Sequence, residues 1–200
     1  MKFKGLFLAL AALALGACET AKNALSAVET RELKLTGVEV YVAPEVIIRW
    51  PSAVNAYAGH ANLNMSDPEA ARALATPEAR AFLNERATAV LKTAIQEEMT
   101  PHLDGSRPVR IRATVTSAKF VNQVETILIG GTDLLVTKFE VIEAKSGAVL
   151  TEHPGVAGTT MKFQGVAGAV INPVVDANND VMARVSKSAA YSFRLWLLPH

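Results

Sequence analysis

The sequence has very little cysteine: Cys18 is the only one among 200 residues. A single thiol excludes a disulfide within the chain and a cysteine-rich zinc site. The fold must therefore depend on packing, and the hydrophobic fraction of 50% is enough for one core of ordinary domain size. We expect a single domain.

An excess of charge of one sign is also missing. Twenty Lys and Arg residues face 19 Asp and Glu residues, which gives a formal net charge of +1. Loss of the first 17 residues, which include Lys2 and Lys4, would make it −1. A near-neutral chain has no electrostatic case for binding nucleic acid. We therefore expect no nucleic-acid partner.

Motifs for catalysis and metal binding are absent as well. The chain has no G-x-S-x-G elbow, no phosphate-binding loop and no H-E-x-x-H pair. Asp176 and Asp180 lie four residues apart near the start of a predicted final helix, where capping explains them more simply than a calcium site. The four histidines are scattered and are expected on the surface: His60, His102, His153 and His200. We predict no enzyme activity, no metal and no cofactor.

One apolar run stands out, from Leu6 to Leu15, with Lys2 and Lys4 before it. A helix that crosses a membrane needs about 20 apolar residues, and this run is shorter. Its length and its cationic flank are typical of a secretory signal peptide. We expect residues 1–17 to be a cleaved leader.

The leader ends in Leu15-Gly16-Ala17-Cys18, which resembles the lipobox of bacterial lipoprotein precursors. The resemblance implies lipidation at Cys18: the thiol carries a diacylglyceryl group, cleavage falls before the cysteine, and its new amino group receives a further acyl chain such as palmitate. Two or more chains give stable anchoring. Glu19 in place of aspartate implies the outer membrane, with the domain facing the periplasm. The alternative is an ordinary secretory peptide in which Cys18 is incidental.

Residues 18–32 are interpreted as the lipidated cysteine and a tether, followed by a single domain over 33–200. If flexible, the tether has a root-mean-square reach of about 20 Å. A short amphipathic helix is the competing interpretation, because Ala21, Leu25 and Val28 fall at helical spacing.

In the first half of the domain, alternation predicts a strand over 33–42, with 46–50 as its continuation or as a second short strand. A loop is expected over 51–65. Capping signals at Ser66-Asp67-Pro68-Glu69 and Thr76-Pro77 predict a short helix to Leu74 and a long one that stops at Pro101.

In the second half, a strand over 109–116 has one apolar and one polar face. A hairpin is expected in which Gly130-Gly131 turns between 127–129 and 134–142. The other predictions are a turn at 145–147, a strand over 148–152, a glycine-bearing loop over 153–172, and a final helix that opens at Asn172-Pro173.

This order predicts an α+β two-layer sandwich, with a mainly antiparallel sheet of three to five strands and two main helices on one face. The order, together with the turn from Glu143 to Gly147, resembles the β-α-β-β-α envelope lipoproteins. These include several groups of unassigned function and the auxiliary lipoproteins of ABC-type transporters. No functional residue follows from this resemblance.

Two features are candidates for interaction. Arg110 and Arg112 share one strand face, which either binds phosphates or a partner's carboxylates, or is simply solvated. The apolar residues of the 153–172 loop, Phe163 among them, form either core or a flap that contacts a partner or a membrane.

The preferred hypothesis is a non-catalytic, membrane-anchored accessory or adaptor in envelope assembly or transport. It would bind an envelope protein through the open sheet face or the glycine loop. The alternative is a periplasmic carrier or sensor of a small apolar ligand, which requires an enclosed cavity. Its expected lining is Phe82, Phe139, Phe163 and Trp196. A hydrolase has the least support, because its motifs are missing.

Overall fold

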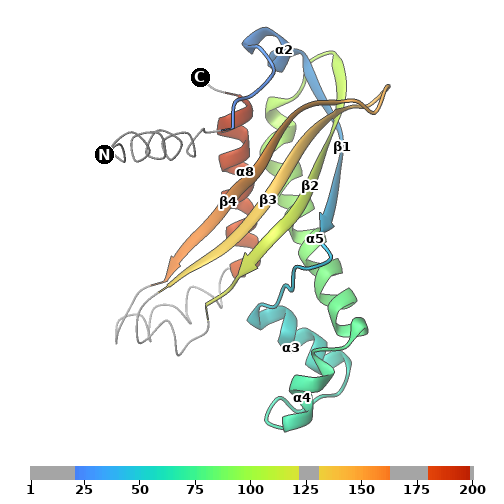
Figure 1. The fold of residues 1–200 in the computed structure, drawn as a ribbon, viewed down its shortest axis with the longest axis vertical. Helices are drawn as coiled ribbons and strands as arrows, with labels where there is room; N and C mark the ends of the chain where they lie inside the picture. Colours follow the sequence, from blue (N-terminus) through green and yellow to red (C-terminus); the bar gives the residue numbers. More distant parts are fainter. Residues whose placement is uncertain (1–20, 122–130, 163–179, 199–200) are drawn as a thin grey trace, which may run out of the picture.

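The protein is described from a computed structural model that covers residues 21–121, 131–162 and 180–198. A four-stranded sheet in the order β1-β2-β3-β4 has the long helices α5 and α8 on one face (Figure 1). β1 is parallel to β2, and the other two pairs are antiparallel. The predicted α+β sandwich is therefore confirmed.

The chain enters this sheet through helix α2 (Ala27–Glu32) and strand β1 (Leu33–Val42). Ser26 and Glu29 form a complete capping box at the start of α2. The predicted strand over 33–42 is confirmed. In the segment interpreted as a tether, residues 27–32 form this short helix, and Asn23 and Ala24 are hydrogen-bonded to the domain.

Between β1 and α5 the chain forms an arm of two short helices, α3 (Pro51–His60) and α4 (Pro68–Ala73). The loop expected over 51–65 is wrong as far as His60, since Pro51 starts α3 and Tyr57 buries its ring, and is confirmed for 61–65. The segment 46–50 is extended but belongs to no strand, although Ile48 and Trp50 are buried. In α4 the helix position is confirmed, but Asp67 caps it without a side-chain hydrogen bond.

Helix α5 (Pro77–Met99) starts and ends where predicted. The Thr76 hydroxyl accepts a hydrogen bond from the Ala79 backbone N–H at 3.3 Å, and a short 3-10 turn, η2 (Thr100–His102), follows. One stripe at helical spacing packs onto the sheet: Leu83, Ala87, Leu91, Ile95 and Met99.

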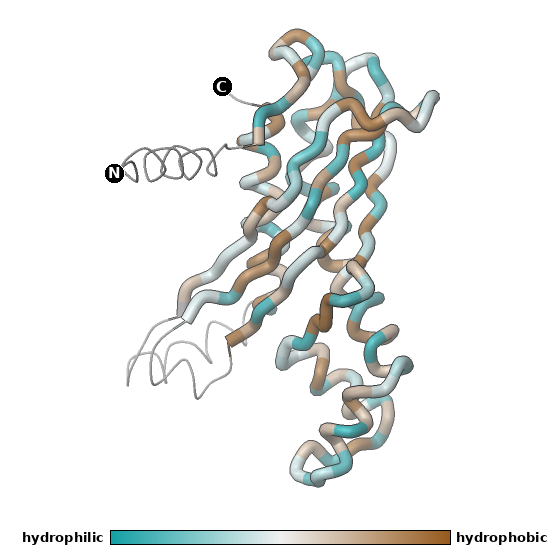
Figure 2. The backbone as a smooth tube through the Cα atoms, viewed as in Figure 1, coloured by the Kyte–Doolittle hydropathy of each residue, from teal (hydrophilic) through white to brown (hydrophobic). Residues whose placement is uncertain are grey.

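Strands β2 (Arg107–Lys119) and β3 (Gly131–Glu143) pair directly with each other. Apolar and polar residues alternate along β2, as its colours show (Figure 2). The expected pairing of β3 with 127–129 is wrong, since β2 and β4 occupy both of its edges. Gly131 belongs to the strand instead of a turn; residues 127–130 lie outside the described part.

Strand β4 (Val149–Lys162) follows the predicted turn, in which Gly147 has a φ of 76°. The loop expected from 153 onward is wrong as far as 162, because these residues continue the strand. Gly158 has a packing reason: a Cβ atom there would overlap the Val185 carbonyl and lie 2.8 Å from the Ala189 side chain. Because glycine has no Cβ atom, β4 can approach α8 closely.

Helix α8 (Val181–Leu197) closes the fold. The Asp180 carboxylate accepts hydrogen bonds from the Met182 and Ala183 backbone N–H groups at 2.7 and 3.4 Å, which confirms the capping role predicted for this residue. The Asn172-Pro173 start and Asp176 lie outside the described residues. In the core, Phe193 of α8 stacks on Phe139 of β3 with ring centroids 4.1 Å apart.

Candidate functional site

The sheet face opposite α5 and α8 is the candidate site, because none of the described helices lies over it (Figure 1). Two parts of it differ in chemistry. We call the part near the β3–β4 turn the charged half and the part near the ends of β2 and β4 the apolar half. In Figure 1 these lie toward the upper and lower ends of the domain.

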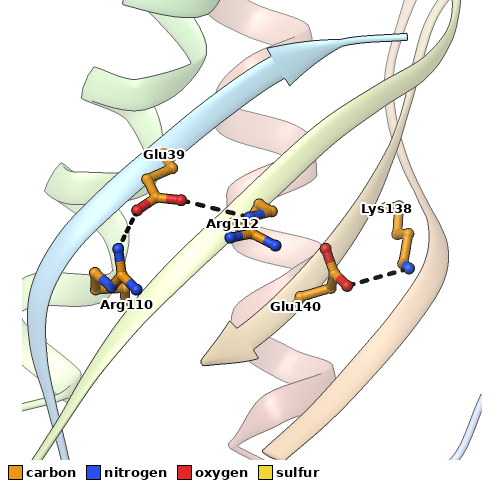
Figure 3. A network of polar contacts seen from close by, with 5 residues as sticks. All are labelled: Glu39, Arg110, Arg112, Lys138 and Glu140. Atoms are coloured by element: carbon orange, nitrogen blue, oxygen red, sulfur yellow. Dashed lines mark hydrogen bonds and ion pairs between the residues drawn. The ribbon is translucent and has the colours of Figure 1, made fainter. Parts of the chain in front are cut away.

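In the charged half, both predicted arginines contact Glu39 of the neighbouring strand β1 (Figure 3). Arg110 Nη1 lies 2.5 Å from Glu39 Oε1, and Arg112 Nε lies 3.4 Å from Glu39 Oε2. Both arginine side chains are 38% exposed. Part of their charge is thus already compensated within the sheet, which favours the solvated-face interpretation over an anion site.

The pairing continues across the sheet. Lys138 Nζ lies 3.0 Å from Glu152 and 3.2 Å from Glu140, and these two hydrogen bonds raise the pKa of Lys138. Arg107 bonds to Glu143 at 2.8 Å. The Ser146 hydroxyl and the Arg107 guanidinium lower the pKa of Glu143. On the open face, three basic and three acidic side chains therefore form a neutral array. The Arg107–Glu143 pair belongs to the helix-facing side, because Glu143 pairs with the buried Val109.

The apolar half carries Leu134 and Val136 of β3 and Met161 of β4. Val136 pairs with Ala157, Leu134 with Thr159 and Thr132 with Met161, so these partners share the open face. Met161 is 84% exposed, whereas Leu134 and Val136 are half-buried. We call Leu134, Val136 and Met161 the apolar patch.

Sequence reasoning did not find this patch. Met161 and Val156 both fall in the predicted 153–172 loop, but the structure separates them: Val156 is buried in the core and Met161 is exposed. The strand register that joins Met161 to Leu134 and Val136 gives no local signal. Phe163 and the rest of that loop lie outside the described residues.

A buried carboxylate holds the strands together below the patch. Asp133 is fully buried, and its oxygens accept hydrogen bonds from the Val121 backbone N–H and the Thr160 hydroxyl, each at 3.0 Å. These donors lie just after β2 and on β4. The strand ends that carry the apolar patch are therefore fixed relative to one another.

At the upper end, residues 21–25 are bonded to the end of α8 and the start of β4. We call them the N-terminal segment. Asn23 Nδ2 donates to the Leu197 carbonyl at 2.9 Å, and the Ala24 N–H donates to the Thr151 hydroxyl at 3.1 Å. The Trp196 indole N–H donates to the Ala21 carbonyl. The chain that leads from Cys18, itself outside the described residues, therefore joins the domain here.

The three described histidines do not gather, and His200 lies outside the described residues. The ring of His153 is half-buried and meets the Trp196 ring edge-on at 5.0 Å, and its Nδ1 accepts a hydrogen bond from the Gly155 N–H at 3.2 Å. Burial lowers the pKa of His153. His60 stacks on Phe82, and His102 is exposed. Within the described ranges, no three His, Cys, Asp or Glu side chains are grouped to hold a metal ion.

The aromatic residues expected around an apolar ligand are separated. Phe139 and Trp196 both contact Phe193, whereas Phe82 packs against Tyr57 and His60 of the arm. A groove of about 380 Å³ between α5 and α8 is a surface feature, lined in part by Val90, Ala94 and Ala183. These features give the carrier hypothesis no specific support.

No protein-family model matches the chain, and no curated protein matches it. A candidate lipoprotein from Caulobacter crescentus CB15 is similar in structure at 15% identity, over 56% of this chain and 81% of its own, with a TM-score of 0.37. The PelC dodecamer from Paraburkholderia phytofirmans aligns at 13% identity over 90% and 93% of the two chains, also at 0.37. At these TM-scores neither similarity carries an argument about function.

In the described part of the chain, no helix combines the length and the apolar character that a membrane span requires.

Proposed function

We propose that the protein is a non-catalytic lipoprotein, anchored through acyl chains on Cys18, that serves as an accessory or adaptor in envelope assembly or transport. The leader with Lys2 and Lys4 and the sequence Leu15-Gly16-Ala17-Cys18 support the anchor. The domain would face the periplasm, and Glu19 favours the outer membrane.

The observation that carries this proposal is the attachment of the N-terminal segment to α8. Three residue steps separate Cys18 from Ala21, which is at most about 11 Å of extended chain. Because Ala21 is bonded to Trp196, the lipid would hold the upper end of the domain close to the bilayer. The lower end, with the apolar patch, would then face away from the membrane.

The apolar patch is the surface that we assign to a protein partner. Exposed apolar side chains grouped on one face mark interaction sites more often than isolated ones do. The core of a protein interface is depleted in charge, and the patch differs from the charged half in this respect. The apolar patch also has a defined shape, because the hydrogen bonds of Asp133 fix the strand ends that carry it.

The anchor is tested with Cys18→Ala in the source bacterium or in a Gram-negative host. We expect the wild-type protein to sediment with membranes, to carry the mass of the acyl groups, and to accumulate as precursor with globomycin. The variant should lose all three properties. A wild-type protein of unmodified mass would contradict the proposal.

The partner surface is tested by placing a photo-crosslinking amino acid at Met161, with Gln96 on the opposite side of the domain as the matched control. Both positions are exposed, so neither change should affect folding. We expect a reproducible adduct at Met161 that Leu134→Asp abolishes, and no such adduct at Gln96. Adducts of equal yield at both positions, or none at either, would contradict a role for the patch.

A further inference from the structure

We propose that the upper end of the domain itself touches the lipid bilayer, with Val28, Val149 and Leu195 entering the headgroup region. This inference rests on the proposed function, because only an acylated Cys18 would bring this end to a membrane. It adds a second contact beside the acyl chains and thereby a fixed orientation of the domain.

The three side chains belong to three elements that meet at one end. Val28 lies on α2, Val149 opens β4, and Leu195 lies in the last turns of α8. The strand register brings the strand ends together, since Leu33 pairs with Arg107, and Val109 with Glu143. The hydrogen bonds of the N-terminal segment to Leu197 and Thr151 place the end of α8 beside the start of β4. The starts of β1 and β2 therefore lie beside the β3–β4 turn (Figure 1).

These side chains are exposed although they are apolar: 67% for Val28, 48% for Val149 and 37% for Leu195. Apolar side chains that dip about 5–10 Å into the headgroup boundary are the usual means of interfacial attachment. Trp196, beside Leu195, also suits this depth, because its indole ring is amphipathic. Its N–H already donates to Ala21, three residues after the proposed lipid site.

The charges around this surface indicate which lipids matter. The exposed basic residues Lys22, Arg31, Lys34 and Lys145 outnumber the exposed acidic residues Glu29, Glu32 and Asp104 by one. An excess of a single charge gives little attraction to anionic lipids. The contact should therefore depend on the apolar side chains and on the tether, with little dependence on ionic strength.

The test uses two exposed aliphatic positions at opposite ends of the molecule, Val149 and Ile47. Ile47 precedes the arm and is 58% exposed. Val149→Cys and Ile47→Cys are each labelled with the environment-sensitive dye NBD in the full acylated protein. The lipid occupies the Cys18 thiol, so each variant offers one reactive site. Vesicles of phosphatidylethanolamine and phosphatidylglycerol, with and without nitroxide-labelled lipid, receive the protein.

We expect the probe at Val149 to shift to shorter wavelength and to be quenched by nitroxide lipid several-fold more than the probe at Ile47. Equal exposure of both probes to water, in protein whose mass shows acylation, would overturn this inference and leave the anchor intact. Strong quenching of both would overturn the orientation. Protein without acyl groups that fails to stay with the vesicles would instead contradict the proposed function.

Discussion

The upper and lower parts of the β3–β4 hairpin differ in how their two faces are covered. Near the turn, side chains cover both faces: on the helix side Phe139 stacks on Phe193, and on the open face Lys138 bonds to two glutamates. Toward the lower end, Gly158 meets α8 by backbone contact, and the opposite face exposes Leu134, Val136 and Met161. Side chains thus cover both faces of the upper part, whereas the described residues leave one face of the lower part without a cover.

The largest effect should come from the buried side of the upper part. Phe139→Ala removes a fully buried ring that stacks on Phe193, and we expect a loss of about 3–5 kcal/mol in the free energy of unfolding. Val136→Ala, on the open face of the same strand, should cost less than about 1.5 kcal/mol. Urea denaturation followed by circular dichroism measures both. Equal losses would remove the distinction between the two faces.

The next effect concerns the close contact of β4 and α8. Gly158→Ala places a methyl group against the Val185 carbonyl, and we expect a loss of about 1–3 kcal/mol. Gly155→Ala is the matched control in the same strand, because its new Cβ meets only the Val136 side chain, at 3.2 Å. A tolerated Gly158→Ala would mean that α8 shifts without cost. Thermal unfolding of both variants gives the comparison.

A smaller effect depends on pH. Burial lowers the pKa of His153, while in the unfolded chain a histidine titrates near 6.5. Below about pH 6.5 the unfolded state therefore binds more protons, and the free energy of unfolding falls as the pH falls. His153→Gln should flatten this part of the pH profile, measured by urea titrations at several pH values. An unchanged slope would show that other groups determine it.

The smallest effect is expected in the charged half. Glu39→Gln removes the carboxylate shared by Arg110 and Arg112, yet exposed ion pairs contribute only about 0–1 kcal/mol. The difference from wild type should shrink further as salt is added. A loss as large as that of Phe139→Ala would show that the array is a main source of stability.

Periodicity and capping predicted much of this fold. Strand 33–42, the long helix from Pro77 and the turn at Gly147 each carry local signals that the structure confirms. Helix α3 was missed because its buried face is made of Ala53, Tyr57 and Ala58, and two small alanines give only a weak helical period. β4 was cut short because glycine is typical of loops, whereas Gly158 is required by a helix nearly thirty residues further along.

Less of the candidate site could be predicted from the sequence. The alternation that places Arg110 and Arg112 on one face is local, but Glu39 is 71 residues from Arg110. The apolar patch likewise depends on the register of β3 with β4, which local patterns do not specify. Sequence therefore found the face, and the structure was needed to find which part of it is uncovered.

The hydrogen bond from Trp196 to Ala21 joins positions 175 residues apart. Contacts so distant in sequence form late, since the loop between them must first be closed. If the chain is exported as proposed, nearly the whole polypeptide must leave the secretion channel before this bond can form. A newly exported chain would therefore first be joined to its lipid through a longer unfolded segment. Only when the final helix docks would the domain take a fixed orientation at the membrane, as a late step of folding.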